Sequence, residues 1–417
     1  EQLTLNQRVI GSSPIRPTTS QTALLALGER RSRWSGGVSE GPRLPPSQRD
    51  PAERGCLLPV SGPKVLPFLT CSPKNHPYTA PVPTVLLLTS GSRGDVEPFC
   101  HLGVALADRG HDVKLVTHER FRSLATSRGL AFAPLDDGLL ELGEAQGAAR
   151  DPLALVRESQ RIIGRTLEQA WQAAAGADVV VHHPKALAGP TLADALGVPA
   201  VLVLFVPMLV PTSGFAHPLL GGRDLGPLNR LTYAIDRLIV APYRGTLNRW
   251  RRAHALPPLP SLPRLDELAD GTRTPVLFPF SRALVPRPPD WPPRVHQTGS
   301  WFPPDRESDG AQPLDAKLER FLQAGPPPVY FGFGSMTGGD AAARTRVVLR
   351  SAERVGARAV IATGWGALAD LSAEADPERA CFVEGAPHAA LFPRVAAVVH
   401  HGGAGTTAAG LRAGRPT

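Results

Sequence analysis

The chain has 417 residues, of which 42% are hydrophobic, and a formal net charge of +8. This length accommodates two ordinary domains, each with a sizeable apolar core. Residues 1–82 carry about +5 of the charge, which leaves only about +3 on the rest, so the basic balance does not indicate a nucleic-acid-binding protein.

The cysteines and the apolar runs restrict the class of protein further. The longest apolar candidate, residues 198–210, is short and interrupted by Pro199 and Pro207, which favours a core strand entering a loop over a membrane span. The cysteine spacings match neither a CxxC motif nor a zinc site, and we expect free thiols in a reducing, cytoplasmic compartment. These cysteines are Cys56, Cys71, Cys100 and Cys381.

Residues 1–82 are rich in Pro, Ser, Arg and Gly and lack sustained hydrophobic periodicity. Such a composition does not bury enough apolar surface to offset the entropy of ordering. We therefore interpret residues 1–82 as a disordered extension, or as a spurious one that results from a start placed too early. No function is assigned to them.

Regular structure is predicted from Thr84 onward. Residues 84–90 form a continuous apolar run of strand length, as expected for a parallel strand that is buried on both faces. Residues 91–94 break the strand, and Pro98 is expected in the first turn of a helix that ends at Gly110. With the next strand at residues 111–118, this is a βαβ unit whose functional turn follows the first strand.

The same alternation predicts the remainder of a first domain. Residues 207–229 are rich in Pro and Gly and predict a long loop or broken helices, a kind of segment that is usually functional. The proline-rich region near the end of the first domain predicts an interdomain linker at residues 303–314. We expect helices over residues 151–175, 192–196 and 233–253, and strands over residues 178–181, 200–205, 276–280 and 295–302.

A second α/β series follows, with helices over residues 314–323 and 341–354 and strands over 329–333, 359–363, 381–384 and 396–399. The last strand leads into two histidines, a glycine cluster and an alanine-rich helix. A strand, a glycine turn and a helix direct backbone N–H groups and a positive dipole end at an anion. The alternative is an ordinary glycine-rich turn of an α/β protein.

Three motifs occur in a fixed order: GSRGDVEP at 91–98, VYFGFGSM at 329–336 and HHGGAGTT at 400–407. Together they resemble the UDP-glycosyltransferase superfamily, in the branch that holds sterol glucosyltransferases and glycopeptide or macrolide glycosyltransferases with a family 28-type N-terminal domain. The resemblance covers roughly residues 84–417.

The resemblance implies an α/β protein of the GT-B type, with two Rossmann-like domains facing across a cleft. Residues 83–302 would bind the acceptor and residues 315–417 the nucleotide sugar. Family members carry an Asp-Gln or Glu-Gln pair that holds the sugar hydroxyls, and a final crossing helix, beyond the position of Thr417. We therefore expect a truncated second domain, with the sugar-selecting residues past that position.

Asp95 is the candidate catalytic base. Inverting glycosyl transfer needs a base for the acceptor hydroxyl, and in related enzymes the aspartate of GSRGD is the proposed base. Asp is also a preferred helix N-cap, so a capping role is the alternative. Arg93 either contacts phosphate or is solvated.

The donor site is expected around His401, which aligns with the family histidine that contacts the diphosphate. Ser335 is a second phosphate contact or a helix cap, and His400 ends its strand as a structural histidine. Trp365 and His388 fall in segments that neighbour the uracil in relatives, or they serve packing. The backbone that would complete the anion site belongs to Gly402, Gly403, Ala404, Gly405 and Thr406.

On the acceptor side, His182, His183 and Lys185 follow a predicted strand and are expected to face the cleft or to be structural. The His-His pair has no third ligand at a suitable spacing, and the resemblance implies an enzyme that works without metal, so we expect no metal site. Asp136-Asp137 is interpreted as a solvated turn.

We therefore predict an inverting glycosyltransferase that moves a hexose from a UDP-sugar, or another NDP-sugar, to a hydroxyl of a lipophilic sterol, lipid or polyketide antibiotic. The UDP-sugar is a co-substrate, and no other cofactor and no nucleic acid are expected. Peripheral membrane contact would suit a lipid acceptor, although no amphipathic basic helix stands out in the sequence.

Two other classes stay open. One is a catalytically inactive nucleotide-sugar-binding fragment. The other is a Rossmann-type oxidoreductase, which is disfavoured because GSRG lacks the GxGxxG pattern and only Glu119 could serve as its ribose-binding acid.

Overall fold

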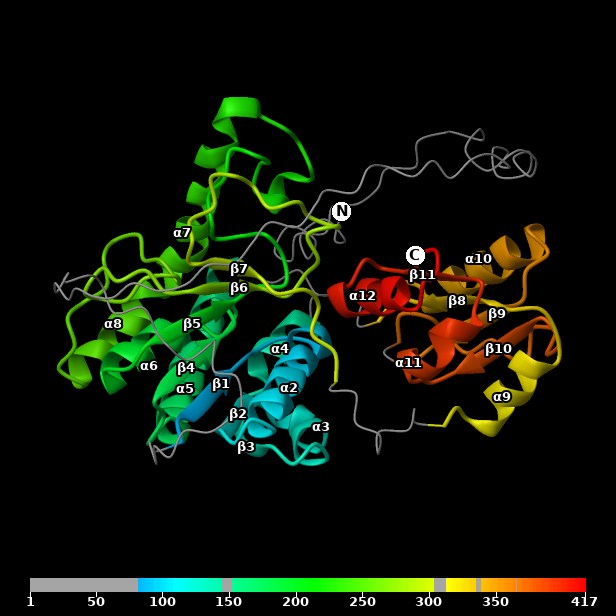
Figure 1. Ribbon diagram of the computed structural model, residues 1–417, viewed down its shortest axis with the longest axis horizontal. Helices are drawn as coiled ribbons and strands as arrows, with labels where there is room; N and C mark the ends of the chain where they lie inside the picture. Colours follow the sequence, from blue (N-terminus) through cyan, green and yellow to red (C-terminus); the bar gives the residue numbers. More distant parts are fainter. Residues whose placement is uncertain (1–81, 145–151, 304–312, 335–338, 365) are drawn as a thin grey trace, which may run out of the picture. The chain divides into compact units, whose positions relative to one another are not determined.

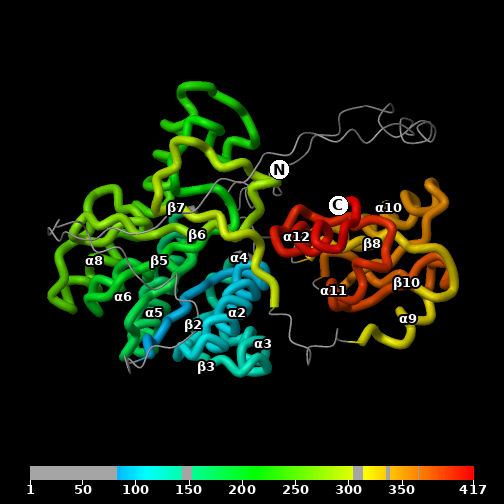
Figure 2. Tube along the Cα trace, viewed as in Figure 1, coloured from blue at the N-terminus to red at the C-terminus, as the bar shows by residue number. Residues whose placement is uncertain are grey.

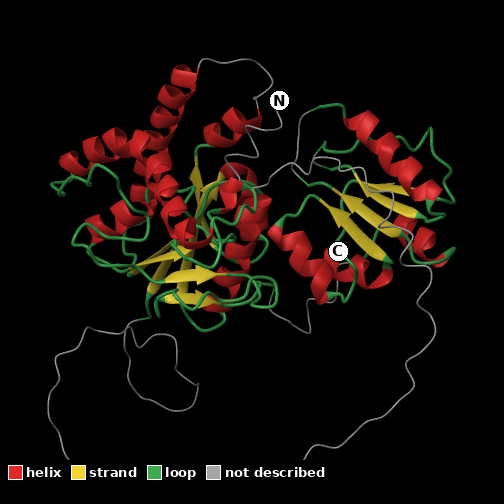
Figure 3. Cartoon of the chain, turned by 90° about the horizontal axis from the view of Figure 1, so that it is seen from above, coloured by secondary structure: helices red, strands yellow, loops and turns green. Residues whose placement is uncertain are grey.

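The computed structural model describes residues 82–144, 152–303, 313–334, 339–364 and 366–417. In this part of the chain the strands form two parallel β-sheets with helices packed on both faces (Figures 1 and 3). The predicted α/β class is confirmed. Residues 1–81 of the extension, most of the linker, Ser335 and Trp365 lie outside the described residues, and the predicted domain boundaries stay predictions.

The first sheet has seven strands in the order β3-β2-β1-β4-β5-β6-β7, and every neighbouring pair is parallel. The chain can be followed through them by colour in Figure 2. The strands are β1 (Thr84–Leu88), β2 (Asp112–His118), β3 (Ala131–Leu135), β4 (Val179–His182), β5 (Ala200–Val203), β6 (Val276–Phe278) and β7 (Val295–Gln297). The helices among them are α2 (Arg93–Ala107), α3 (Arg122–Thr126), α4 (Gly138–Glu144), α5 (Pro152–Ala173) and α6 (Gly189–Leu196).

Alternating side chains of the central strands supply two separate cores. Leu86 and Leu88 of β1 pack with α5 and α6 on one face, while Val85 and Leu87 pack with α2 and α3 on the other. Successive strand residues point to opposite faces, so a strand that is covered on both sides must be apolar throughout. This requirement explains the unbroken apolar runs in the sequence.

The segment between β5 and β6 departs from the predicted helix over residues 233–253. It consists of the 3-10 helices η3 (Pro218–Leu220), η4 (Gly226–Ala234) and η5 (Ala241–Tyr243) and the helices α7 (Ile235–Val240) and α8 (Arg244–Ala253). Pro242 has no N–H to continue the α-helical ladder, which accounts for the break after α7. The loop with broken helices predicted at residues 207–229 is confirmed.

Pro98 also lies elsewhere than predicted. Helix α2 begins at Arg93, so Pro98 is its sixth residue and lies inside the helix rather than in its first turn. A proline there removes one intrahelical hydrogen bond.

The second sheet has four parallel strands in the order β10-β9-β8-β11. Helices α9, α11 and α12 pack against one face and α10 against the other. The strands are β8 (Val329–Gly332), β9 (Ala359–Ala362), β10 (Ala380–Val383) and β11 (Ala397–His400). The helices of the second sheet's domain are α9 (Ala316–Gln323), α10 (Ala341–Arg354), α11 (His388–Leu391) and α12 (Ala404–Arg412), together with the 3-10 helix η6 (Phe392–Arg394). The first sheet's domain has one more 3-10 helix, η2 (Glu119–Phe121), after β2.

Two cysteines fall within the described residues, and both are buried free thiols: Cys100 in α2 and Cys381 in β10. Burial raises the pKa of the Cys100 thiol to about 11, which disfavours the reactive thiolate. Among the described helices, none is both long enough and apolar enough to cross a membrane.

One close approach in the first sheet constrains the sequence after β4. His182 is fully buried, and a Cβ added to Gly189 at the start of α6 would lie 2.2 Å from Cγ of its ring. The helix can come this close to the sheet only because residue 189 has no side chain.

We therefore expect Gly189→Ala to lower the free energy of unfolding by roughly 1–3 kcal/mol through overpacking, measured by denaturant titration. Gly245→Ala in α8 is the matched control, because its added Cβ meets no atom within 4 Å. That control should be neutral or stabilising by up to roughly 1 kcal/mol. Adding His182→Ala should relieve part of the Gly189→Ala loss, and strict additivity of the two changes would contradict the packing account.

Candidate active site

The predicted site residues follow strands at which the order of each sheet reverses. In an open parallel sheet, ligands bind outside the carboxyl ends of the strands at such a switch point. In the first sheet β1 lies between β2 and β4, and in the second β8 lies between β9 and β11. Asp95 follows β1 and Lys185 follows β4, while Gly334 follows β8 and His401 follows β11.

These residues form two groups, which are described separately. The Asp95 site comprises Ser92, Asp95, His183 and Lys185. The His401 site comprises Gly334 and the segment from His401 to Thr406.

The carboxylate of Asp95 is held by three donors. Its Oδ2 accepts hydrogen bonds from the Ser92 backbone N–H at 2.8 Å, from the Ser92 hydroxyl at 3.1 Å and from Lys185 Nζ at 2.7 Å. Its Oδ1 lies 3.7 Å from His183 Nε2. The contacts therefore concentrate on one oxygen, and the other is available to a further proton donor.

Asp95 does support the helix, as the alternative reading expected, but from another position. Ser92 is the N-cap of α2, and Asp95 is the third residue of the helix, whose carboxylate accepts from the Ser92 N–H in a capping box. A cap does not exclude a catalytic role, because the same carboxylate also reaches Lys185.

The electrostatics keep Asp95 ionised. Burial acts to raise its pKa, since the side chain is only 14% exposed, but the Lys185 ammonium, His183 and the bond from Ser92 outweigh this and hold the pKa below its usual range. Burial lowers the pKa of His183 to about 4, with Lys185 acting in the same direction and Asp95 against it. His183 is therefore neutral near pH 7.

Gly91 is required by the position of Asp95. It has a φ of +128°, and a Cβ there would lie 2.3 Å from Asp95 Oδ2. Both the backbone conformation and the space occupied by the carboxylate thus exclude a side chain. This accounts for the first glycine of the GSRGD motif.

His118 supports the same turn and was not singled out in the sequence. Its buried ring accepts a hydrogen bond from the Gly91 N–H at Nε2 (3.1 Å), which requires the proton on Nδ1, where the Asp136 carbonyl accepts it at 3.1 Å. Burial lowers the pKa of His118, Asp137 acting in the opposite direction. The only signal in the sequence was its position at the end of a predicted strand.

His182 and His183 do not act as a pair. His182 packs on Gly189 on the α6 side of the sheet. His183 lies on the other side, where its ring stacks on that of Phe205 with 5.5 Å between the ring centroids and meets the edge of the Phe99 ring of α2. Of the two roles expected for His182, its buried position matches the structural one. Consecutive residues at a strand end alternate between faces, so the doublet does not chelate a metal.

Burial lowers the pKa of His182 to about 3. Neither of its ring nitrogens has a hydrogen-bond partner among the described residues. We have no physical account of why a histidine stands at this position.

Arg93 is paired within its own helix. Its guanidinium donates two hydrogen bonds to Glu97, at 2.9 and 3.0 Å, and its side chain is 51% exposed. The geometry matches the solvated alternative. Glu119, the candidate ribose-binding acid, likewise pairs with Arg122 at 2.6 Å.

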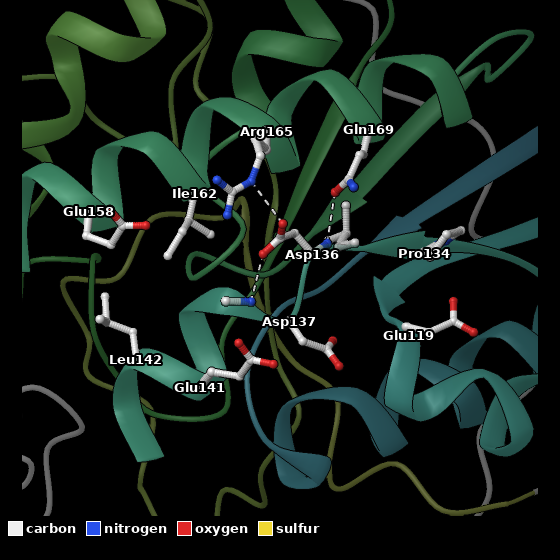
Figure 4. A pocket seen from close by; sticks show the side chains of 12 residues that line it. Glu119, Pro134, Asp136, Asp137, Glu141, Leu142, Glu158, Ile162, Arg165 and Gln169 are labelled. Carbon is white, nitrogen blue, oxygen red and sulfur yellow. Dashed lines mark hydrogen bonds and ion pairs between the residues drawn. The ribbon is translucent and has the colours of Figure 1, made fainter. Parts of the chain in front are cut away.

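A pocket of about 720 Å³ opens beside the end of β3 (Figure 4). Several carboxylates line the pocket, and the side chains of Arg165 and Gln169 enter it from α5, opposite Asp136 and Asp137. Asp136 connects these walls: its Oδ2 accepts from Arg165 Nε at 2.9 Å, and its backbone N–H donates to Gln169 Oε1 at 2.8 Å. The lining includes Glu119, Pro134, Leu135, Asp136, Asp137, Gly138, Glu141, Leu142, Glu158, Ile162, Arg165 and Gln169.

Asp136 and Asp137 do lie at the turn after β3 and are partly exposed, but the interpretation as a solvated turn omitted the ion pair with Arg165 and the place of Asp136 in the pocket wall. Burial acts to raise the pKa of Asp136, but the Arg165 and Gly138 hydrogen bonds outweigh it and lower the pKa. Through its carbonyl, Asp136 also holds His118, so the pocket wall is linked by hydrogen bonds to the turn that carries Asp95. The partner Arg165 comes from a helix that is distant in sequence, which the local pattern did not show.

In the second sheet, His401 lies between two glycines. A Cβ at Gly334 would come 2.8 Å from its Cε1, and a Cβ at Gly403 would come 2.6 Å from its Nε2. The glycines thus make room for the imidazole and bring the ends of β8 and β11 together. Burial lowers the pKa of His401, with the Gly332 backbone acting in the opposite direction.

Helix α12 (Ala404–Arg412) begins within the glycine cluster rather than after it. Gly403 is its N-cap and supplies no side-chain cap, and Ala404 and Gly405 are exposed. The first N–H groups of a helix have no intrahelical partner, so this end is suited to an anion. Thr407 is turned inward, its hydroxyl donating to the Gly403 carbonyl at 2.9 Å.

Gly402 has a different role from its neighbours. Its φ of +88° lies in the region that favours glycine, and its N–H donates to His400 Nδ1 at 3.1 Å. That N–H is already engaged, so Gly402 shapes the turn. His400 ends β11 and supports this turn, consistent with the structural role expected for it.

His388 packs within the second domain. Its ring stacks on that of Phe392, with 4.2 Å between the ring centroids, and lies edge to face with that of Tyr330, at 5.8 Å between centroids. Burial lowers the pKa of His388 to about 4. These contacts match the packing alternative. Within the described part of the chain, no group of three or more His, Cys, Asp or Glu side chains is arranged to hold a metal ion.

Residues 85–210 match the glycosyltransferase family 28 N-terminal domain. A sterol 3-beta-glucosyltransferase of Arabidopsis thaliana is 34% identical over 363 residues, covering 82% of this chain and 54% of the relative. A sterol 3-beta-glucosyltransferase of Yarrowia lipolytica is 33% identical over 358 residues, covering 79% of this chain and 23% of the relative. The chain thus spans between about a quarter and about half the length of these relatives.

Solved structures share the fold. The glycosyltransferase SnogD from Streptomyces nogalater aligns with a TM-score of 0.52 at 23% identity, covering 80% of each chain. The glycotransferase of kitacinnamycin aligns with a TM-score of 0.57 at 18% identity, covering 81% of this chain and 80% of that one. Together with the two parallel sheets, these likenesses define the fold as the GT-B type of the glycosyltransferases. The family 28 match and the sterol 3-beta-glucosyltransferase relatives support an assignment to the UDP-glycosyltransferase superfamily, in the branch that includes the sterol glucosyltransferases.

The Asp95–Lys185 pair gives a direct electrostatic prediction. Lys185→Met should raise the folded-state pKa of Asp95, because the ammonium that favours the carboxylate is lost while the burial that opposes it remains. In the wild type, the depressed pKa contributes stability above the unfolded-state pKa, which is lost as the pH falls through the folded-state value. In the variant the folded-state pKa lies closer to the unfolded-state value, so the loss of stability on acidification should be smaller than in the wild type.

The measurement is a ¹³C NMR titration of the Asp95 carboxyl carbon. The control is Lys317→Met in α9, whose ammonium contacts the Phe382 carbonyl of the other sheet and should leave this titration unchanged. An Asp95 pKa that is equal in Lys185→Met and wild type would contradict the ion pair.

Proposed function

We propose that this chain is the catalytic region of an inverting glycosyltransferase that transfers a hexose from a UDP-sugar to a hydroxyl of a lipophilic acceptor. The observation that supports this most is the placement of an ionised carboxylate at the switch point of one sheet and an anion-suited helix start at that of the other. Inverting transfer needs these two groups: a base for the acceptor and a clamp for the leaving nucleotide.

Asp95 is the proposed base. Its Oδ1 would accept the proton of the acceptor hydroxyl while the hydroxyl oxygen bonds to the anomeric carbon and the bond from that carbon to the UDP oxygen breaks. Asp95 ends the step as a carboxylic acid, and the nucleotide departs as UDP. Attack from the face opposite the leaving group inverts the anomeric centre.

Lys185 and Ser92 would position this base. They occupy Oδ2, so Oδ1 is the oxygen left for the acceptor. The same contacts lower the basicity of the carboxylate, so proton transfer would accompany formation of the glycosidic bond rather than precede it.

The His401 site is the proposed clamp. A neutral imidazole can donate one N–H to a diphosphate oxygen, and the first N–H groups of α12 add backbone donors and the positive end of the helix dipole. These protein groups would neutralise the developing charge, so a metal is not part of the proposed site. Ser335, outside the described residues, stays a proposed second phosphate contact.

The acceptor class is proposed from the relatives, which are named as sterol 3-beta-glucosyltransferases. The pocket beside β3 has apolar side chains such as Leu142 and Ile162 among its carboxylates, so it could accept an apolar molecule that bears hydroxyl groups. Its hydrogen-bonded link to the Asp95 turn through His118 favours a place for it in the acceptor site.

The donor half of the proposal is tested by calorimetry of UDP binding to the 417-residue chain. His401→Ala should weaken binding roughly tenfold to a hundredfold, the effect of losing a hydrogen bond to a charged group. His296→Ala, an exposed histidine of β7, is the matched control and should bind as wild type does. Absence of UDP binding by the folded wild type would contradict the proposed donor site.

The catalytic half is tested with Asp95→Asn, which keeps the shape of the side chain but removes the base. We expect kcat to fall roughly 10²- to 10⁴-fold with UDP affinity unchanged. Asp112→Asn, an exposed residue at the start of β2, serves as the control. UDP binding without turnover by the wild type would instead favour an inactive nucleotide-sugar-binding fragment.

A further inference from the structure

The segment between β5 and β6 exposes large apolar side chains at closely spaced positions. Five of them, here called the leucine surface, come from η4, its N-cap and α7. Their exposed fractions are 43% for Leu225, 57% for Leu228, 69% for Leu231, 61% for Leu238 and 44% for Ile239. In Figures 1 and 2 this green segment projects from the edge of the first sheet beside β6 and β7.

The local helix type explains how these leucines align. In a 3-10 helix the side chains at positions i and i+3 eclipse one another. Leu225, Leu228 and Leu231 follow this spacing along η4 and therefore form one stripe. Leu238 and Ile239 continue the exposed apolar surface on α7, which follows η4 directly.

Two polar side chains of the same segment, those of Asn229 and Asp236, point inward. Asn229 is 1% exposed, and its amide donates to the Ser213 carbonyl at 3.0 Å while its oxygen accepts from the Leu225 N–H at 2.8 Å. The Asp236 carboxylate of α7 is hydrogen-bonded to Nε2 of the buried His217 at 2.9 Å. These two polar side chains thus lie on the inner side of the segment, while the five apolar side chains are exposed.

These buried bonds fix the orientation of the segment. Rotating the leucines inward would break the Asn229 and Asp236 contacts and leave buried polar groups without partners, which is costly. Closely spaced exposed apolar side chains that cannot turn away from water mark an interaction site.

Arginines accompany the leucines. Arg223, Arg230 and Arg237 recur at seven-residue intervals, and Arg223 and Arg230 are exposed. Arg230 lies 3.3 Å from Asp290, whereas Arg223 and Arg237 form no ion pair with any described residue. Of the two acidic residues in residues 221–240, Asp224 is exposed and Asp236 is buried against His217.

We propose that the leucine surface docks the protein on a bilayer that contains anionic lipids, with the leucines in the apolar boundary and the arginines at the phosphates. Long arginine side chains can cover apolar surface while their charged ends reach a polar layer. Apolar side chains flanked by Arg on a short exposed helix are the composition of an interfacial anchor. This surface shares no residue with the Asp95 and His401 sites and does not depend on the proposed reaction.

The experiment is co-sedimentation of the 417-residue chain with vesicles of phosphatidylcholine alone, or with phosphatidylglycerol as about a third of the lipid. We expect the wild type to bind the mixed vesicles more strongly, and this preference to weaken as salt is raised. Leu228→Glu combined with Leu231→Glu should lower the partition coefficient at least tenfold. Arg223→Gln combined with Arg237→Gln should reduce the preference for the mixed vesicles.

The matched control is Val347→Glu combined with Val355→Glu, two valines of the α10 region that are 54% and 63% exposed. This variant should bind vesicles as wild type does. UDP affinity, measured on every variant, should be unchanged, which separates loss of docking from loss of folding and from failure of the donor site.

Three results would overturn the proposal. One is no vesicle binding by the wild type. Another is equal loss in the leucine and valine variants, or no loss in either. The third is a wild type that binds no vesicles but self-associates, where the leucine variant does not; this would assign the surface to a second copy of the chain. Likewise, a wild type that binds no vesicles but glycosylates a detergent-dispersed acceptor, where the leucine variant does not, would assign the surface to the acceptor.

Discussion

The ion pair between Asp95 and Lys185 is the contact around which the first domain's site is arranged. It joins the turn after β1 to the turn after β4, the two strands that meet where the sheet order reverses. The glycine at position 91 is required because this carboxylate fills the space beside it, and His118 is held in one tautomer because it receives the Gly91 N–H. In the proposed reaction, the same pair selects the oxygen of Asp95 that meets the acceptor.

Much of the fold followed from local chemistry in the sequence. Strands buried on both faces must be apolar throughout, so β1, β5, β8 and β11 could be located within a few residues, and the glycine cluster marked the turn into α12. Contacts between distant elements could not be read in this way. The packing partners of His182 and His183, the Arg165–Asp136 pair and the role of His118 all depend on how distant elements come together.

The segment after β5 shows a second limit of sequence reasoning. At the 3.6-residue period of an α-helix, Leu225, Leu228 and Leu231 spread around the axis, and no amphipathic basic helix stood out. The 3-10 geometry of η4 brings them into one stripe. The buried hydrogen bonds of Asn229 that hold this segment form only in the folded molecule, so the sequence pattern did not show them.

The most direct test of the donor site is a crystal structure of the 417-residue chain with UDP bound. We expect the diphosphate to lie at the start of α12, within hydrogen-bond distance of a His401 ring nitrogen and of the Ala404 to Thr406 backbone N–H groups. A diphosphate bound elsewhere, with His401 and this backbone making no contact to it, would contradict the assignment of the donor site.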